Sequence, residues 1–192
     1  MALNGNVTIN KHVLIYNFFK PQIMKKYFLV VTIIPLYFSS QVILGVGRTT
    51  LTNQSVSLEF GTEGKGIVLP WVTSEFAVLN AVPGTLIFDT ADRKVKLKHL
   101  SSWQDLSVDT TGAVNTTLQD SYLEKADAKV SIGHPTNTPG ILVLEDTNKG
   151  MILPLVSSYR DVKQPAAGMV VFDVNSKYLC VFNGTVWSFW GS

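Results

Sequence analysis

The sequence predicts an all-β protein, with two tandem small antiparallel β-meander repeats after an N-terminal signal peptide or hydrophobic helix. Three observations support this fold class. An apolar run follows two lysines near the N-terminus, and a block of eight residues recurs further along the chain. Each copy also carries short β-branched and aromatic segments between turn residues. At 192 residues, the chain is long enough for one domain or two small ones.

Residues 24–41 have the parts of a secretory signal peptide. Two lysines come first, an apolar run covers 27–38, and small polar residues follow. We expect cleavage after export, and the alternative is an uncleaved membrane anchor. A buried core helix is the third alternative, and Pro35 in the middle of the run counts against it. Because signal peptides begin at the N-terminus, residues 1–23 are an uncertain extension, and we expect translation to start at Met24.

The positive charge of the chain is confined to this N-terminal stretch. The whole chain has 16 basic and 14 acidic residues, a formal net charge of +2. Residues 1–41 hold four lysines and no acidic residue, which leaves 12 basic residues against 14 acidic ones in the remainder. A basic surface that neutralises phosphates is therefore not expected there, and no nucleic-acid partner is predicted.

An internal repeat organises the rest of the chain. Residues 65–72 (KGIVLPWV) match residues 149–156 (KGMILPLV), which stand 84 positions further on. The same offset aligns Trp103 with Trp187 without a gap. The predicted organisation is an uncertain extension (1–23), a signal peptide (24–41), a first β-repeat (42–106), a linker (107–128) and a second β-repeat (129–192).

Short strands are expected in the same order in both copies. In the second copy, residues 169–173 and 178–182 are β-branched and aromatic, and Asn183-Gly184 can form a type I′ hairpin turn that leads into 185–190. The corresponding strands of the first copy are expected at 85–89 and 94–98. Each copy is marginally stable alone, so we expect the two copies to pack on each other or on other chains.

Two matched pairs of polar residues are expected to support local backbone structure. Asp89 and Asp173 each end a strand just before a turn, so each carboxylate is expected to accept hydrogen bonds from its own turn. Ser74 and Ser158 each follow an apolar strand that ends in proline. They are expected to cap a short helix or turn.

The motifs, taken together, resemble a repeat module of secreted bacterial surface and fibre-like proteins. The second copy carries them as Val130–Gly133, Lys149–Pro154, Pro165–Asp173 and Tyr178–Trp187. The first copy lacks the Asn-Gly-Thr turn, so its match is partial, and the resemblance covers most of residues 42–192. It implies an exported structural module without a known catalytic residue. One departure is that members usually have an arginine where this chain has Trp71 and Leu155.

No residues with the spacing of a catalytic or metal site are found. His99 and His134 are isolated from cysteines and carboxylates, so no metal site is predicted. Cys180 is the only cysteine, and its place in an apolar segment favours a packed side chain over a nucleophile. We therefore expect a protein that is not an enzyme and has no cofactor.

Three aromatic residues near the C-terminus are the candidate binding residues: Trp190, Trp187 and Tyr178. They could stack on sugar rings, although Trp187, which aligns with Trp103 of the first copy, is more typical of the core of a small sheet, so Trp190 is the better binding candidate. The leading hypothesis is a structural or adhesion module, and the alternative is a carbohydrate-binding module or an accessory subunit of a cell-envelope complex.

The expected partners follow from this hypothesis. They are other surface proteins or further copies of the chain, and glycans if the alternative holds. Contact with a membrane is expected only through the N-terminal segment if it is not cleaved. The expected location is the cell surface or the extracellular space.

Overall fold

The structure is a computed structural model that describes residues 41–117, 119–123, 125 and 127–191. These residues form short strands and two single-turn 3-10 helices, and no α-helix occurs among them. The predicted all-β fold is confirmed for this part of the chain. The predicted signal peptide and N-terminal helix fall almost wholly outside it. Within the described ranges, no helix has the length and apolar character needed to cross a membrane.

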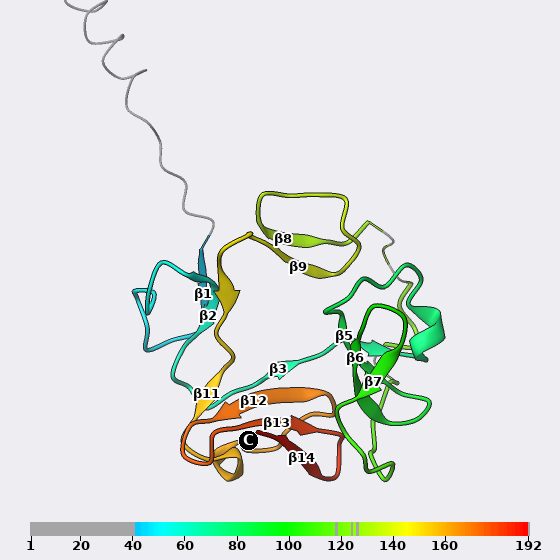
Figure 1. Cartoon of the computed structure of the whole chain (residues 1–192). Coiled ribbons are helices and arrows are strands. Elements are labelled where there is room, and N and C mark those ends of the chain that lie inside the picture. Colours follow the sequence, from blue (N-terminus) through cyan, green and yellow to red (C-terminus); the bar gives the residue numbers. More distant parts are fainter. Residues whose placement is uncertain (1–40, 118, 124, 126, 192) are drawn as a thin grey trace, which may run out of the picture. The chain divides into compact units, whose positions relative to one another are not determined.

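The two copies contribute the same series of elements (Figure 1). The first copy has β1 (Val42–Leu44), β2 (Val56–Phe60), β3 (Ile67–Val68), β4 (Trp71–Val72), η1 (Glu75–Ala77), β5 (Leu86–Asp89), β6 (Lys94–Lys98) and β7 (Trp103–Asp105). The second copy has β8 (Val130–Gly133), β9 (Leu142–Glu145), β10 (Gly150–Met151), β11 (Leu155–Val156), η2 (Tyr159–Asp161), β12 (Met169–Asp173), β13 (Tyr178–Phe182) and β14 (Trp187–Trp190).

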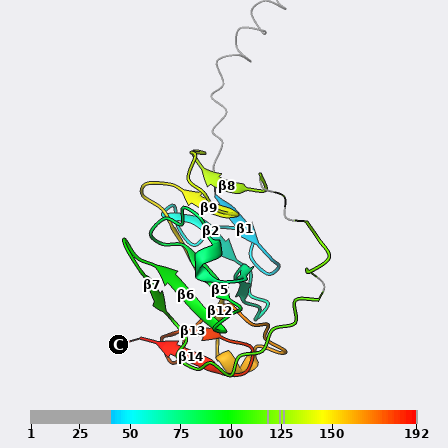
Figure 2. The same cartoon turned by 90° about the vertical axis from the view of Figure 1, so that its right-hand side faces the viewer.

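Four strand pairings recur in both copies. The first two strands run parallel, β1 with β2 and β8 with β9. The antiparallel ladders are β5–β6–β7 in the first copy and β12–β13–β14 in the second (Figure 2). A short strand, β4 or β11, adds in parallel to the first strand of each ladder. The hydroxyls of Ser74 and Ser158 accept hydrogen bonds from Phe76 N and Arg160 N, as expected for caps of η1 and η2.

The strands that follow the Lys-Gly pair leave their own copy. β3 belongs to the first copy, but it pairs antiparallel with β12 of the second (Figure 1). β10 belongs to the second copy, but it pairs parallel with β2 of the first. The sheets are therefore not self-contained antiparallel meanders, and this detail of the two predicted tandem repeats is not supported. The reason is that a strand of two residues makes too few hydrogen bonds to stand alone and is stabilised by joining a neighbouring sheet.

The two antiparallel ladders share one hydrophobic core. Its fully or almost fully buried residues come from both copies: Leu69, Phe88, Val95, Leu106, Ala167, Val170 and Val181. A second cluster of Val156, Val162, Val171 and Cys180 belongs to the second copy alone. The shared core agrees with the expectation that the copies pack on each other, because neither copy encloses these side chains by itself.

Candidate functional site

The matched aspartates are tied to the backbone around them. Asp89 accepts hydrogen bonds from Ala91 N at 2.9 Å and from Glu75 N at 2.7 Å. Asp173 accepts hydrogen bonds from Ser176 N at 2.9 Å and from Tyr159 N at 3.1 Å. Hydrogen bonds to the charged form, from Ser176 first, lower the pKa of Asp173. The expected turn role of both residues is confirmed, and each carboxylate also anchors the 3-10 helix of its copy.

The first copy holds a buried cation beside Asp89. Lys96 is only 5% exposed, and its ammonium lies 3.4 Å from the carboxylate of Asp89. It is also paired with Glu75 and Asp92, each at 2.5 Å. Burial works to lower the pKa of Lys96, but hydrogen bonds to Asp92 and Glu75 outweigh it and raise the pKa above its ordinary value. Lys96 is therefore charged, and its partners serve the structure.

The second copy has an aromatic cluster at the equivalent positions. Cys180 replaces Lys96, Tyr159 replaces Glu75 and Phe189 replaces Asp105. The rings of Tyr159 and Phe189 meet edge to face with centroids 4.8 Å apart. Burial raises the pKa of the Cys180 thiol to about 11, so it remains protonated at neutral pH, as expected for a packed side chain.

The three candidate binding residues do not share one face. Trp187 packs on Phe182 and Tyr159, with centroids 5.1 and 5.9 Å away. Tyr178 lies on the same side of the sheet, since the centroid of its ring is 6.1 Å from that of Phe189. Its side chain is 40% exposed.

Trp190 lies on the opposite face. It is three residues after Trp187, so strand alternation turns the two indoles apart. The indole N–H of Trp190 donates to Leu106 O at 2.5 Å, and the side chain is 38% exposed. Tyr178 and Trp187 can therefore contribute to one surface and Trp190 to another. Sugar binding by any of the three stays a prediction.

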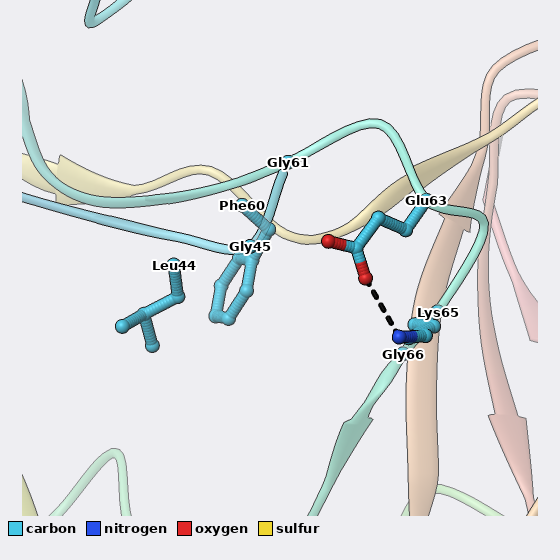
Figure 3. A pocket seen from close by; sticks show the side chains of 7 residues that line it. All are labelled: Leu44, Gly45, Phe60, Gly61, Glu63, Lys65 and Gly66. Carbon is cyan, nitrogen blue, oxygen red and sulfur yellow. Dashed lines mark ion pairs between the residues drawn. The ribbon is translucent and has the colours of Figure 1, made fainter. Parts of the chain in front are cut away.

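A shallow hollow of about 190 Å³ lies beside the start of β3 (Figure 3). It is lined by Leu44, Gly45, Phe60, Gly61, Glu63, Lys65 and Gly66. Glu63 forms an ion pair of 2.8 Å with Lys65, which lowers the pKa of this carboxyl group. Glu63 and Lys65 are the titratable residues of this lining, and they are paired with each other. The described residues also contain no cluster of histidine, cysteine and acidic side chains that could hold a metal ion.

The most distinctive surface is a pair of strand edges in the second copy. β2 is covered by β10, and its Leu58 is fully buried. β9 is the equivalent of β2, but among the described residues only β8 pairs with it. Leu142, the equivalent of Leu58, is 45% exposed, and the adjacent Ile141 is 61% exposed. An exposed apolar strand edge is a template for pairing with another chain.

The glycines of the two Lys-Gly pairs show the same contrast. A Cβ atom at Gly66 would lie 2.5 Å from Met169 Cγ and 2.8 Å from Val171 Cγ1, because β12 passes against β3. A Cβ atom at Gly150 would meet nothing within 4 Å. The face of β10 at Gly150 is therefore open, whereas the face of β3 at Gly66 is covered by side chains of β12. Sequence reasoning missed these edges, because the repeat does not show which strand each Lys-Gly segment joins.

Comparison with known protein families gives a match for the second repeat copy. Residues 131–191, which run from within β8 to just past the end of β14, match the family model described as a phage tail like trimerisation region. No curated protein and no solved structure matches the chain. The match covers about a third of the sequence, and it supports a fibre-like structural character and self-association for this part of the chain.

Proposed function

We propose that this protein is a non-enzymatic, fibre-like structural module that is exported from a bacterial cell and assembles with copies of itself at the cell surface or outside the cell. One observation carries the proposal. Short strands cross between the repeat copies, so that β3 completes the sheet of the second copy and β10 that of the first. A module that completes its sheets with a neighbour's strands is suited to assembly in series, and the trimerisation-region match supports self-association.

The export part of the proposal rests on residues 24–41. Their two lysines, apolar run and small polar residues have the order of a secretory signal peptide. An adhesion role follows from the same location, because a module assembled in series presents many copies of one surface. Multiple weak contacts made by such an array add to a strong overall attachment.

The self-association part is tested by sedimentation of the full chain in a mild detergent that keeps the apolar run in solution. We expect a concentration-dependent trimer or larger species at micromolar protein. A monomer across the whole concentration range would contradict the proposal. Export is tested separately, by fractionation of the native cell and mass spectrometry of the mature N-terminus. A mature protein that starts before Met24 and stays in the cytoplasm would contradict the export part.

A second candidate function is carbohydrate binding. The observation that favours it is the half-exposed Tyr178, which lies beside Phe189 on the aromatic face of the second copy. Aromatic rings with one free face are suited to stack on sugars. A glycan array with the full chain tests this function, with Tyr178→Ala and Trp190→Ala as variants on opposite faces. Binding that is lost in one variant, with an unchanged circular dichroism spectrum, would support this second function.

A further inference from the structure

We infer that two chains of this protein join head to tail, with the open edge of β9 in one chain pairing with β3 of the next and the open edge of β10 pairing with β5 of the next. This contact repeats the one that joins the two repeat copies within each chain. This inference rests on the proposed self-association and specifies its interface. The argument uses the repeat itself: each half of the internal contact has an equivalent, 84 residues away in the sequence, that no described strand covers.

The internal contact consists of two strand pairings. β2 pairs with β10, where Leu58 lies opposite Met151. β3 pairs with β12, where Ile67 lies opposite Val170. When each strand of these pairings is replaced by its equivalent in the next repeat copy, β9 pairs with β3 of a second chain, and β10 pairs with β5 of that chain. In this arrangement Leu142 lies opposite Ile67 of the second chain.

β3 has backbone N–H groups on the edge that faces away from β12, where a second strand could pair. Leu69 N donates to Gly168 O at 3.0 Å, and hydrogen-bonded and non-hydrogen-bonded pairs alternate along an antiparallel ladder. The N–H groups of Gly66 and Val68 therefore point away from β12, to the open edge.

The equivalent N–H groups of the second copy show what these donors bind. Gly150 N donates to Ser55 O at 2.8 Å, and Ile152 N donates to Leu58 O at 2.9 Å. β3 of a second chain would meet β9 in the same way, with its Val68 N–H directed at Leu142 O.

β9 offers the matching acceptor. Val130 N of β8 donates to Ile141 O at 2.8 Å. Because successive carbonyls of a strand point to opposite edges, the carbonyl of Leu142 points away from β8. The side chains of Leu142 and Ile141 are exposed beside it, so the same edge supplies both a hydrogen-bond acceptor and apolar surface.

At its N-terminal end, β5 also has a strand edge that no described strand covers. In the second copy, Gly168 and Val170 are buried under β3. Their equivalents Gly84 and Leu86 are exposed and half-buried, and β4 pairs with β5 only at Phe88 and Asp89. β10 of another chain fits this end of β5, because β10 is the equivalent of β3.

The inferred contact is heterologous, since it joins the second copy of one chain to the first copy of the next. Such contacts close into a ring when the rotation per chain allows it, and otherwise extend into a filament. A trimer of chains corresponds to a ring of six repeat copies. Both outcomes use the same four strands.

Cross-linking of the full chain tests the inference. Leu142→Cys together with Ile67→Cys is expected to give a ladder of covalent multimers with a short bismaleimide, while each single variant does not. The native Cys180 is fully buried, and burial raises its pKa to about 11, so the unmodified chain is a clean background. If instead the second repeat copies of two chains paired with each other, Leu142→Cys together with Met151→Cys would give the multimers. That result would overturn the inference.

Two further variants test the same edges by sedimentation. Leu142→Asp is expected to raise the dissociation constant about tenfold or more, because it places a charge in the strand contact. Leu100→Asp is its control, since Leu100 is 90% exposed and lies in the β6–β7 turn. Gly150→Val is expected to preserve the circular dichroism spectrum and abolish assembly, because its side chain has open space only in the single chain.

The outcomes separate the two proposals. A chain that is monomeric at every concentration contradicts the proposed self-association. An oligomer that survives both Leu142→Asp and Gly150→Val, without a ladder from the Leu142→Cys and Ile67→Cys pair, overturns the head-to-tail contact and leaves self-association standing.

Discussion

The two repeat copies have one plan but differ in what surrounds equivalent residues. Leu58 and Leu142 occupy the same position in β2 and β9, yet Leu58 is fully buried and Leu142 is 45% exposed. The difference comes from β10, which covers β2, while no described strand covers β9. Burial at this position therefore depends on the neighbouring copy, and the local sequence does not decide it.

The copies also stabilise the same corner in different ways. The first copy uses the buried ion pairs of Lys96, and the second uses packed aromatic rings around Cys180. The aspartate is kept at both places, as Asp89 and Asp173. A hydrophobic cluster needs no partner for each atom, whereas a buried cation depends on every carboxylate around it.

The largest expected effect is at this corner. Lys96→Met removes the cation and leaves the buried carboxylate of Asp89 without its counter-charge. We expect a loss of about 3–5 kcal/mol in the free energy of unfolding, measured by urea denaturation. Lys65→Met is the control, because Lys65 forms an exposed ion pair with Glu63 and should change stability by about 1 kcal/mol or less. Equal effects of the two variants would contradict the structural role of Lys96.

The next comparison uses the leucines of β2 and β9. Leu58→Ala is expected to cost about 2–5 kcal/mol, because the side chain is fully buried. Leu142→Ala is expected to cost about 1 kcal/mol or less in urea denaturation at low protein concentration. At high concentration its cost should rise, since assembly stabilises the folded chain by mass action. A cost for Leu142→Ala that does not depend on concentration would argue against a covered β9 edge.

A smaller effect is expected at the hydrogen bond between the copies. The indole N–H of Trp71 donates to Ala167 O at 2.7 Å. Trp71→Phe removes this bond while keeping an aromatic ring, so we expect a loss of about 1 kcal/mol, measured by thermal unfolding. Leu155, the equivalent residue, has no such donor, and Leu155→Phe serves as the control. A larger cost for Leu155→Phe than for Trp71→Phe would contradict a role of this bond in docking the copies.

The smallest and most local effect concerns Glu145. Hydrogen bonds from Ser131 and Thr136 lower the pKa of Glu145 to about 2, below its usual 4.5. A lowered carboxyl pKa stabilises the folded state above pH 4.5, and this contribution is lost as the pH falls toward 2. The protection factors of the β8–β9 amides, which are exchange rates corrected for the intrinsic pH dependence of amide exchange, should therefore fall over this range. In Glu145→Gln, these protection factors should be lower at neutral pH and should change less between pH 4.5 and 2. An identical pH profile for both proteins would contradict this assignment.

Much of the local structure was predictable from residue types. The strands at 169–173 and 178–182 were expected from β-branched and aromatic runs, and the strand at 94–98 was expected as the first copy's counterpart of 178–182. The structure contains all three. The turn roles of Asp89 and Asp173 were also predictable, because a carboxylate before a turn reaches nearby N–H groups without help from the rest of the fold. The split of Trp187 and Trp190 between two faces could have been read from their spacing of three, since strand side chains alternate.

The candidate interface was not predictable in the same way. Residues 65–72 and 149–156 share five of their eight residues, and their sequence identifies neither the copy that each short strand joins nor the edge that remains open. A two-residue strand presents hydrogen-bonding groups on both edges, so its partner is chosen by where the chain brings the neighbouring copy.

By itself, the sequence determined the repeat, the order of its strands and the turns between them, because these depend on residues close together in the chain. Only the tertiary structure decided that β3 and β10 cross between copies and that β9 keeps an uncovered edge. These features depend on contacts between residues about 100 positions apart, such as Ile67 with Val170 and Leu58 with Met151. Local propensity carries no information about such contacts, and packing selects them.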